Sequence, residues 1–118
     1  MGEIKRLASN PRMSGAVAHG GVVSLSGQVA IDHRGGAVAV QIREVLERID
    51  LLLAEAGTDK SRLLTANLYL TDIGSLPALN IAWDRWVAPG CAPTRTTIQT
   101  VLASPDYALE IAVTAAVD

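Results

Sequence analysis

The stretch GAVAVQIREVLERIDLLLAEAG, residues 36–57, decides the fold class. Its apolar residues recur three and four positions apart, while charged residues occupy the opposite side of a helical projection. The apolar positions are Ile42, Val45, Leu46, Ile49, Leu52, Leu53 and Ala56. Gly57 suits the left-handed cap that ends many helices. We therefore predict an amphipathic helix between Gly36 and Gly57 that buries one face.

The residues before this helix predict a β-hairpin. Residues 22–31, VVSLSGQVAI, alternate apolar and polar side chains as a half-buried strand does. The expected inward side chains are Val23, Leu25, Val29 and Ile31. The His-Gly-Gly turn signal at 19–21 joins this strand to a shorter one at 16–18, and residues 4–7 predict a further edge strand.

The residues after the helix predict a strand, a second helix and two more strands. Residues 64–71 alternate in the same way, with four side chains expected to face inward: Leu64, Ala66, Leu68 and Leu70. The second helix is expected to begin near Ser75, with Pro77 in its first turn. The last two strands are expected at 95–102 and 108–117.

This order of elements predicts an α+β fold with one mixed β-sheet, in a single domain that spans residues 1–118. Each helix has one apolar stripe, so both helices can cover the same face of the sheet. On the last strand the other face carries Ala112, Thr114 and Ala116, which are small and weakly polar. Because aromatic residues make up only 3% of the chain, the core is thin. We therefore expect a second copy of the chain to cover the other face.

Composition excludes several classes of protein. Ten Lys plus Arg against twelve Asp plus Glu give a net charge of -2, and the pI is near 5.6, so nucleic acid is not an expected partner. No apolar run could cross a membrane and residues 1–10 are too polar for a signal peptide, so we expect a cytoplasmic protein. The single cysteine, Cys91, excludes an internal disulfide, and no motif predicts a metal or cofactor.

Arg95 is the leading candidate for a ligand-binding residue. It begins a predicted strand directly after Ala-Pro-Thr, and hydroxyl side chains rather than acids follow it. A guanidinium in such surroundings can offer its planar fork to the carboxylate of a ligand. The simpler alternative is an arginine that points into water or pairs with an acid distant in the sequence.

Ser26 and Gly27 form a second candidate. A glycine inside a strand allows another group to approach the backbone closely, and the serine hydroxyl can donate or accept a hydrogen bond. A plain β-bulge would explain the glycine equally well.

The other reactive side chains have simpler explanations. His19 and His33 lie beside glycines with no second ligand or acid at a useful spacing, so we expect solvated loop residues. Cys91 is expected to be an inert, half-buried thiol. Trp83 and Trp86 lie three positions apart on one helical face, which is typical of core packing.

Four segments together resemble the RidA family, also called YjgF-type or reactive intermediate deaminase proteins. They are SLSGQV at 24–29, NIAW at 80–83, APTRTT at 92–97 and LEI at 109–111. The resemblance spans nearly the whole chain, and the pairing of SGQ with a later Pro-x-Arg is its most specific part. The segments at 80–86 and 104–107 are most similar to the YoaB-like branch of the family.

The resemblance implies a chorismate-mutase-like fold, a homotrimer and pockets at the subunit interfaces that bind small 2-oxo or 2-imino carboxylates. Arg95 takes the position of the family's ligand-anchoring arginine, and Ser26 and Gly27 lie on the strand that lines the same pocket. Thr97 stands where the family commonly has a cysteine whose backbone amide contacts the ligand. Asn80 matches a frequent family asparagine.

Two pocket positions depart from the family pattern. Met13 stands where the main-branch enzymes have a tyrosine. The pocket glutamate, which positions the attacking water, aligns with Ala112. Glu110 is expected to point to the opposite face of the strand, although a one-residue bulge would reverse that direction. General acid–base help is typically worth about 10² to 10⁴ in rate, so its loss would leave a pocket that binds substrate but turns it over feebly.

The sequence therefore leaves two main functions open. One is a hydrolase of the 2-iminobutanoate/2-iminopropanoate deaminase type, in which Arg95 provides orientation and charge neutralisation. The other is a non-catalytic protein that binds or senses a small carboxylate. A ribonuclease or translation inhibitor, also associated with this family, fits poorly with the acidic pI.

Overall fold

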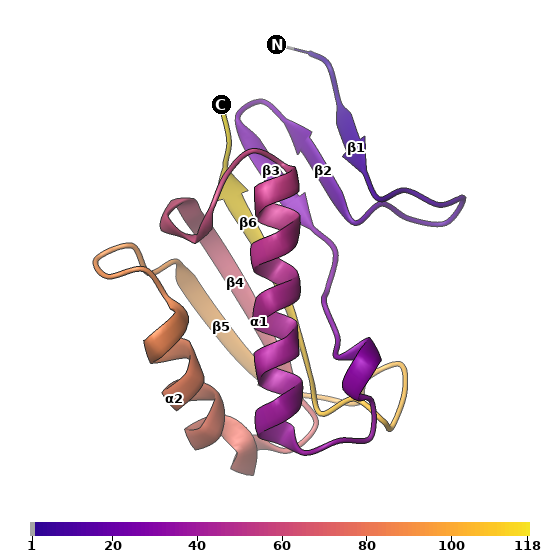
Figure 1. Ribbon diagram of the computed structural model, residues 1–118, viewed down its shortest axis with the longest axis vertical. Coiled ribbons are helices and arrows are strands. Elements are labelled where there is room, and N and C mark those ends of the chain that lie inside the picture. Colours follow the sequence, from indigo (N-terminus) through magenta and orange to yellow (C-terminus); the bar gives the residue numbers. More distant parts are fainter. Residues whose placement is uncertain (1) are drawn as a thin grey trace.

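The computed structural model describes residues 2–118, and its strands and helices follow the predicted order (Figure 1). They are β1 (Lys5–Leu7), β2 (Ala16–His19), β3 (Val22–Leu25), α1 (Val38–Glu55), β4 (Leu63–Leu70), α2 (Leu76–Trp86), β5 (Thr94–Gln99) and β6 (Leu109–Ala116). Three 3-10 turns, η1 (Ile31–His33), η2 (Lys60–Arg62) and η3 (Ile73–Ser75), precede α1, β4 and α2. The hairpin, both helices and the edge strand β1 are confirmed.

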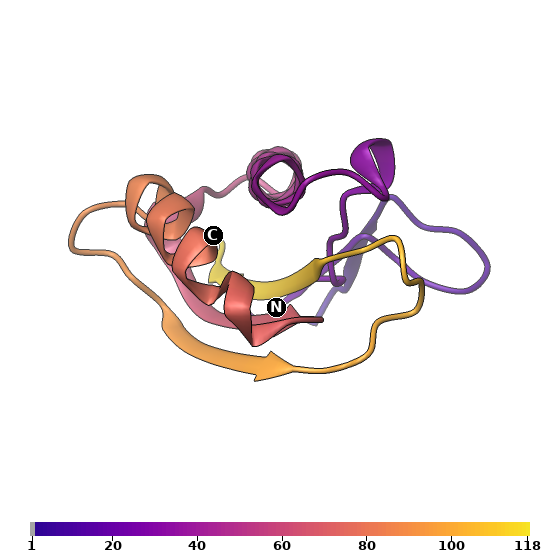
Figure 2. The same ribbon diagram turned by 90° about the horizontal axis from the view of Figure 1, so that it is seen from below.

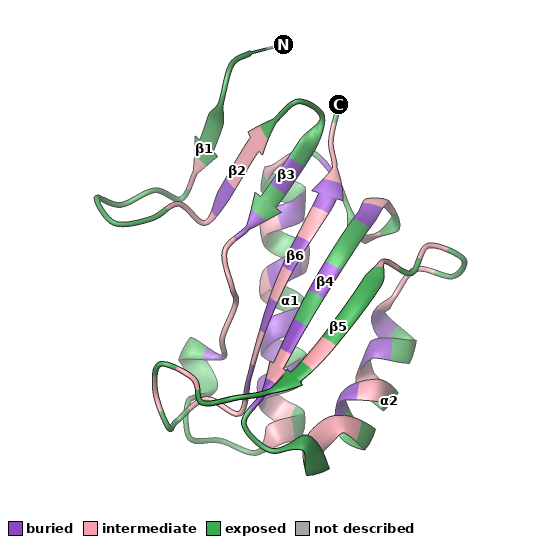
Figure 3. Cartoon of the chain, turned by 180° about the vertical axis from the view of Figure 1, so that it is seen from behind, coloured by how far each residue is buried: buried purple, intermediate pink, exposed green. Residues whose placement is uncertain are grey.

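One six-stranded sheet holds all the strands, in the order β1-β2-β3-β6-β4-β5. Among the paired strands, β4 and β5 are parallel and the other pairs are antiparallel. A parallel pair needs a crossover connection, and α2 provides it between β4 and β5. Both helices lie on the same face of the sheet (Figure 2), and the opposite face carries no helix (Figure 3). The predicted α+β fold with two helices on one face is confirmed.

The core lies between the helix pair and the sheet. Strand β6 alternates strictly, with Leu109, Ile111 and Val113 buried against the helices and the residues between them half-buried on the open face. The inward stripe of α1, which includes Ile42 and Ile49, packs above it. Within residues 2–118, neither helix combines the length and apolarity needed to cross a bilayer.

The strand predicted at 22–31 ends earlier, at Leu25. The chain leaves the ladder after Leu25, touches β6 again through an isolated bridge between Gln28 and Ile111, and then turns into η1. The expectation that Ile31 is buried is wrong, because that side chain is exposed in η1. The alternation of apolar and polar residues therefore continues to Ile31, although the strand itself ends at Leu25.

Leu64 is also misplaced by the sequence pattern. A β-bulge shifts the β4–β6 register between Leu63 and Thr65, so Leu63 takes the buried position and Leu64 is 43% exposed. Likewise, the strand predicted at 95–102 ends at Gln99. Its parallel partner β4 ends at Leu70, so no ladder remains beyond that point.

Candidate functional site

Arg95 lies on β5, which is an edge strand of the sheet. Its ladder partner, Ala66, is buried under the helices, so Arg95 also projects to the helix side. There its Cζ atom lies 5.7 Å from the centroid of the Trp83 ring. Arg95 takes part in no ion pair among residues 2–118. The guanidinium therefore lies on an aromatic face with its hydrogen-bonding edges free for a carboxylate.

Thr97 is two residues after Arg95 on β5, and Asn80 lies on α2, the helix whose Trp83 contacts Arg95. Thr97 pairs with the buried Leu68, so it points to the same side of the sheet as Arg95. The Gln99 side chain accepts a 2.7 Å hydrogen bond from the Ile73 backbone, just before α2 begins. The start of α2 therefore lies near Gln99 and its Trp83 near Arg95, and Asn80 lies between these two contacts along the helix.

The Oδ1 atom of Asn80 is buried, and no donor among residues 2–118 reaches it. A buried acceptor without a partner is costly in a folded protein and is often found where a ligand donates. We call Asn80, Arg95 and Thr97 the arginine half-site.

Gly27 lies directly against Glu110 of β6. A Cβ atom at position 27 would collide with the Glu110 carboxylate, so only glycine leaves room for that group. Two backbone hydrogen bonds between Gln28 and Ile111, of 2.8 and 3.2 Å, hold the segment against β6. Ser26 adds a 2.9 Å backbone hydrogen bond to the carbonyl of Gly15. We call Ser26, Gly27 and Glu110 the glutamate half-site.

Met13 lies in the loop between β1 and β2 and is 50% exposed. Asn10 fixes this loop, because its side chain accepts a hydrogen bond from the Met13 backbone and its own backbone donates to the Met13 carbonyl. The loop continues to Gly15, which bonds to Ser26. Met13 therefore belongs to the loop beside the glutamate half-site and is free to contact another molecule.

The prediction that Glu110 and Ala112 point to opposite faces is wrong. Glu110 pairs with Tyr69 and Ala112 with Asn67, and both side chains point to the open face of the sheet because they are two residues apart. The alternation of Leu109, Ile111 and Val113 already contained this signal. Glu110 therefore lies on the same face of β6 as the position of the family's pocket glutamate.

One chain does not bring the two half-sites together. Arg95 is level with Val113 of β6 through Ala66, whereas Glu110 is three residues further along and faces the other side of the sheet. With strands about 4.8 Å apart and about 3.3 Å per residue, the two backbones are about 14 Å apart. A ligand that touches both Arg95 and Glu110 therefore needs more than one copy of the chain.

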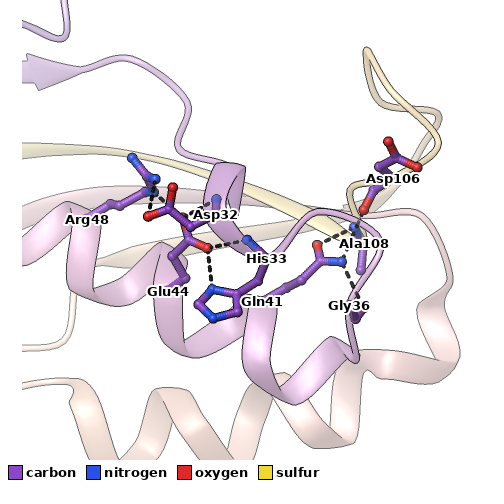
Figure 4. Close-up of polar contacts among 8 residues, drawn as sticks. All are labelled: Asp32, His33, Gly36, Gln41, Glu44, Arg48, Asp106 and Ala108. Carbon is purple, nitrogen blue, oxygen red and sulfur yellow. Dashed lines mark hydrogen bonds and ion pairs between the residues drawn. The ribbon is translucent and has the colours of Figure 1, made fainter.

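His33 is not simply a solvated loop residue, as the sequence suggested. Its Nδ1 atom lies 2.7 Å from the Glu44 carboxylate, although the ring is half exposed (Figure 4). His19 is exposed and Cys91 half-buried, in line with the sequence. Within residues 2–118 no three His, Cys, Asp or Glu side chains gather as a metal site.

The family described as Endoribonuclease L-PSP matches residues 3–117. The chain belongs to this YjgF/RutC/L-PSP family, also called RidA. A RutC family protein of Haemophilus ducreyi is 40% identical over 115 residues, which cover 98% of this chain and 97% of the relative. The RutC family protein YoaB of Escherichia coli is 35% identical over 114 residues, 97% and 98% of the two chains.

A solved structure shares the fold. NMB1025 of Neisseria meningitidis, a member of the YjgF family, matches with a TM-score of 0.92 at 38% sequence identity. The match covers 98% of this chain and 96% of that one. The RidA-type sheet and helix pair are therefore common to both proteins.

Proposed function

We propose that this RidA family member is a hydrolytic deaminase of small 2-imino acids, releasing ammonia and the corresponding 2-oxo acid. The observation that carries the proposal is the Glu110 carboxylate lying over Gly27 in the SGQ segment. It puts an acid–base group beside the segment that the family resemblance assigns to the ligand pocket. Ala112 still stands at the position of the family's glutamate. We propose that Glu110, two residues away on the same face of β6, takes over its role.

Arg95 is the proposed anchor for the substrate carboxylate. Its guanidinium rests on Trp83 and has no ion-pair partner among residues 2–118. A carboxylate would form two parallel, charge-assisted hydrogen bonds with it. Thr97 on the same face of β5, and the Oδ1 atom of Asn80 on α2, which has no donor among residues 2–118, would bind the polar groups next to that carboxylate.

Glu110 is the proposed proton-transfer group. Its carboxylate takes a proton from a water molecule while the water oxygen bonds to C2 of the protonated imine. The proton then passes to the nitrogen of the resulting carbinolamine. Ammonia leaves with the electron pair of the C2–N bond, and the C2 hydroxyl gives its proton to the Glu110 carboxylate as it becomes the 2-oxo group. That proton then passes to the released ammonia, which departs as ammonium. Such help typically contributes about 10² to 10⁴ in rate.

A homotrimer would unite the two half-sites across subunit interfaces. The half-sites of one chain lie on opposite faces of the sheet, which argues for a site shared between copies. The open face of the sheet exposes Ile98 together with small and hydroxyl side chains, a surface suited to cover by another copy. Met13 would then reach the site from the loop next to Ser26.

The test generates 2-iminobutanoate in situ and follows ammonia release with the wild type, Arg95→Ala and Glu110→Gln. Arg95→Ala is expected to raise KM about 10- to 100-fold through the lost charged hydrogen bonds. Glu110→Gln is expected to lower kcat by about 10² or more. Arg43→Ala, at an exposed position of α1, is the control and should behave as wild type.

Ammonia release at the uncatalysed rate with wild-type protein would overturn the proposal. Titration of the same proteins with 2-oxobutanoate separates the remaining alternative. Binding that depends on Arg95 without any hydrolysis would identify a carboxylate-binding protein instead.

A further inference from the structure

Two polar side chains of α1 are buried on the flank that faces away from α2. Gln41 and Glu44 are three residues apart, so they lie one above the other on the helix surface. They are only 2% and 6% exposed. Buried amides and carboxylates are expensive unless their hydrogen bonds are satisfied. Here every partner except Arg48, which lies on α1 itself, comes from two loops (Figure 4).

Glu44 binds the segment that follows the glutamate half-site. Its carboxylate accepts hydrogen bonds from the backbone N–H groups of Asp32 (3.1 Å) and His33 (3.0 Å), and from the His33 ring (2.7 Å). Arg48 adds a charge-assisted hydrogen bond from the next turn of α1. Burial alone would raise the pKa of Glu44, but these donors together lower it to about 2. Glu44 is therefore a fixed negative charge at neutral pH.

Gln41 binds the segment that leads into β6. Its Nε2 group donates to the carbonyls of Gly36 (3.0 Å) and Asp106 (3.1 Å), and its Oε1 atom accepts from the backbone N–H of Ala108 (2.9 Å). The Ala108 amide is two residues before Glu110. The two loops also hold each other, because the Gly35 backbone donates to the Asp106 carbonyl over 2.8 Å.

From these contacts we propose that Gln41 and Glu44 are positioning residues that set where the Glu110 carboxylate lies relative to Gly27. This inference rests on the proposed function, since it names what holds the proposed proton-transfer group. Glu44 fixes the chain after Gly27 and Gln41 fixes the chain before Glu110. Neither side chain touches the half-site itself, so both act through the backbone.

The hydrogen-bond partners make each position specific for one of two nearly isosteric side chains. Glu44 meets donors at both oxygens, so an amide there would turn an N–H₂ group toward two donors. Gln41 meets two carbonyls with its N–H₂ group, so a carboxylate there would face two acceptors. Glu44→Gln therefore places an N–H₂ group against donors, and Gln41→Glu loses the two hydrogen bonds to carbonyls, with almost no change in volume.

The kinetic test measures imine hydrolysis by Glu44→Gln and Gln41→Glu. A displacement of the Glu110 carboxylate by about 1 Å would lower kcat by about 10- to 100-fold. KM should stay within about twofold of the wild type, because the proposed carboxylate anchor is in the other half-site. Glu55→Gln, at an exposed position of the same helix, is the matched control and should keep the wild-type kcat.

A second measurement does not depend on activity. Hydrogen exchange of the Gln28 and Ile111 amides, which form the bridge beside Gly27, should speed up in both variants. The Leu68 amide in the centre of the sheet should keep its protection, which separates local loosening from global destabilisation. Unchanged exchange at Gln28 and Ile111, or a rise in KM with kcat preserved, would overturn the inference. If the wild type itself hydrolyses no imine, the proposed function fails and the exchange data alone decide whether Gln41 and Glu44 position this segment.

Discussion

At the scale of single residues, the contact between Gly27 and Glu110 matters most. The glycine has an ordinary backbone conformation, so its small size rather than its flexibility is what the position requires. The group that fills the space is a carboxylate at the end of a flexible side chain. A larger residue at Gly27 should therefore displace the Glu110 carboxylate, with little effect on the stability of the fold.

Gly27→Ala separates activity from stability. The added methyl displaces the Glu110 carboxylate, so we expect kcat for imine hydrolysis to fall about 10- to 100-fold. Because Glu110 can swing aside, the free energy of unfolding should change by less than about 1 kcal/mol. Ammonia release and urea unfolding measure the two effects. A loss of several kcal/mol with normal kcat would contradict this view of the position.

The lowered pKa of Glu44 predicts how stability depends on pH. Its folded value of about 2 lies below the ordinary value of 4.5, so the stabilisation from its charge is present above pH 4.5 and is lost as the pH falls through about 2. The stability difference between wild type and Glu44→Gln should therefore be largest near neutral pH and shrink over this acidic range. Urea unfolding at a series of pH values measures it, with Glu55→Gln as control. A difference that stays constant from neutral pH down to pH 2 would contradict the assignment.

At the scale of elements, β4 lies at the centre of the fold. It pairs with β6 on one side and β5 on the other, and its bulge between Leu63 and Thr65 changes which side chains are buried. Leu64 and Leu68 therefore occupy opposite environments, although the sequence pattern assigns both to the core.

Alanine substitutions at Leu64 and Leu68 should differ in their effect on stability. Leu68→Ala should cost about 2–5 kcal/mol of the free energy of unfolding, because the side chain is fully buried. Leu64→Ala should change the free energy of unfolding by no more than about 0.5 kcal/mol, as substitutions at other surface positions do. Urea unfolding of both variants gives the comparison. Equal losses would mean that the strand follows the unbroken alternation and has no bulge.

At the scale of the whole molecule, the arrangement of the two half-sites predicts complementation between inactive variants. Arg95→Ala and Glu110→Gln each remove one half-site. If every site combines halves from neighbouring copies, mixing, unfolding and refolding the two variants one to one should leave about one quarter of the sites intact. Ammonia release by the mixed sample then exceeds that of either variant alone. No recovery, together with a sedimentation mass near that of one chain, would contradict a shared site.

Periodicity in the sequence predicted the helices and most strands, because a buried face repeats every 3.6 or 2 residues regardless of what covers it. The residue types and their immediate neighbours, rather than periodicity, identified Arg95, Ser26 and Gly27 as candidate binding residues. The sequence reading placed Glu110 on the wrong face of β6, although the alternation around Ile111 shows that it shares a face with Ala112. It gave no sign that Gln41 and Glu44 bind two loops, one of them about 65 residues away.

The sequence by itself therefore determined the element order, the one-sided helix layer and the family. Only the tertiary structure decided where β3 ends, which β4 leucines are buried, and that Glu110 lies over Gly27 while Arg95 faces the other side of the sheet. The physical reason is that local patterns depend on burial of nearby side chains. Contacts between distant strands depend on bulges and loops, and the residues that contact one another there are determined only when the whole sheet has formed.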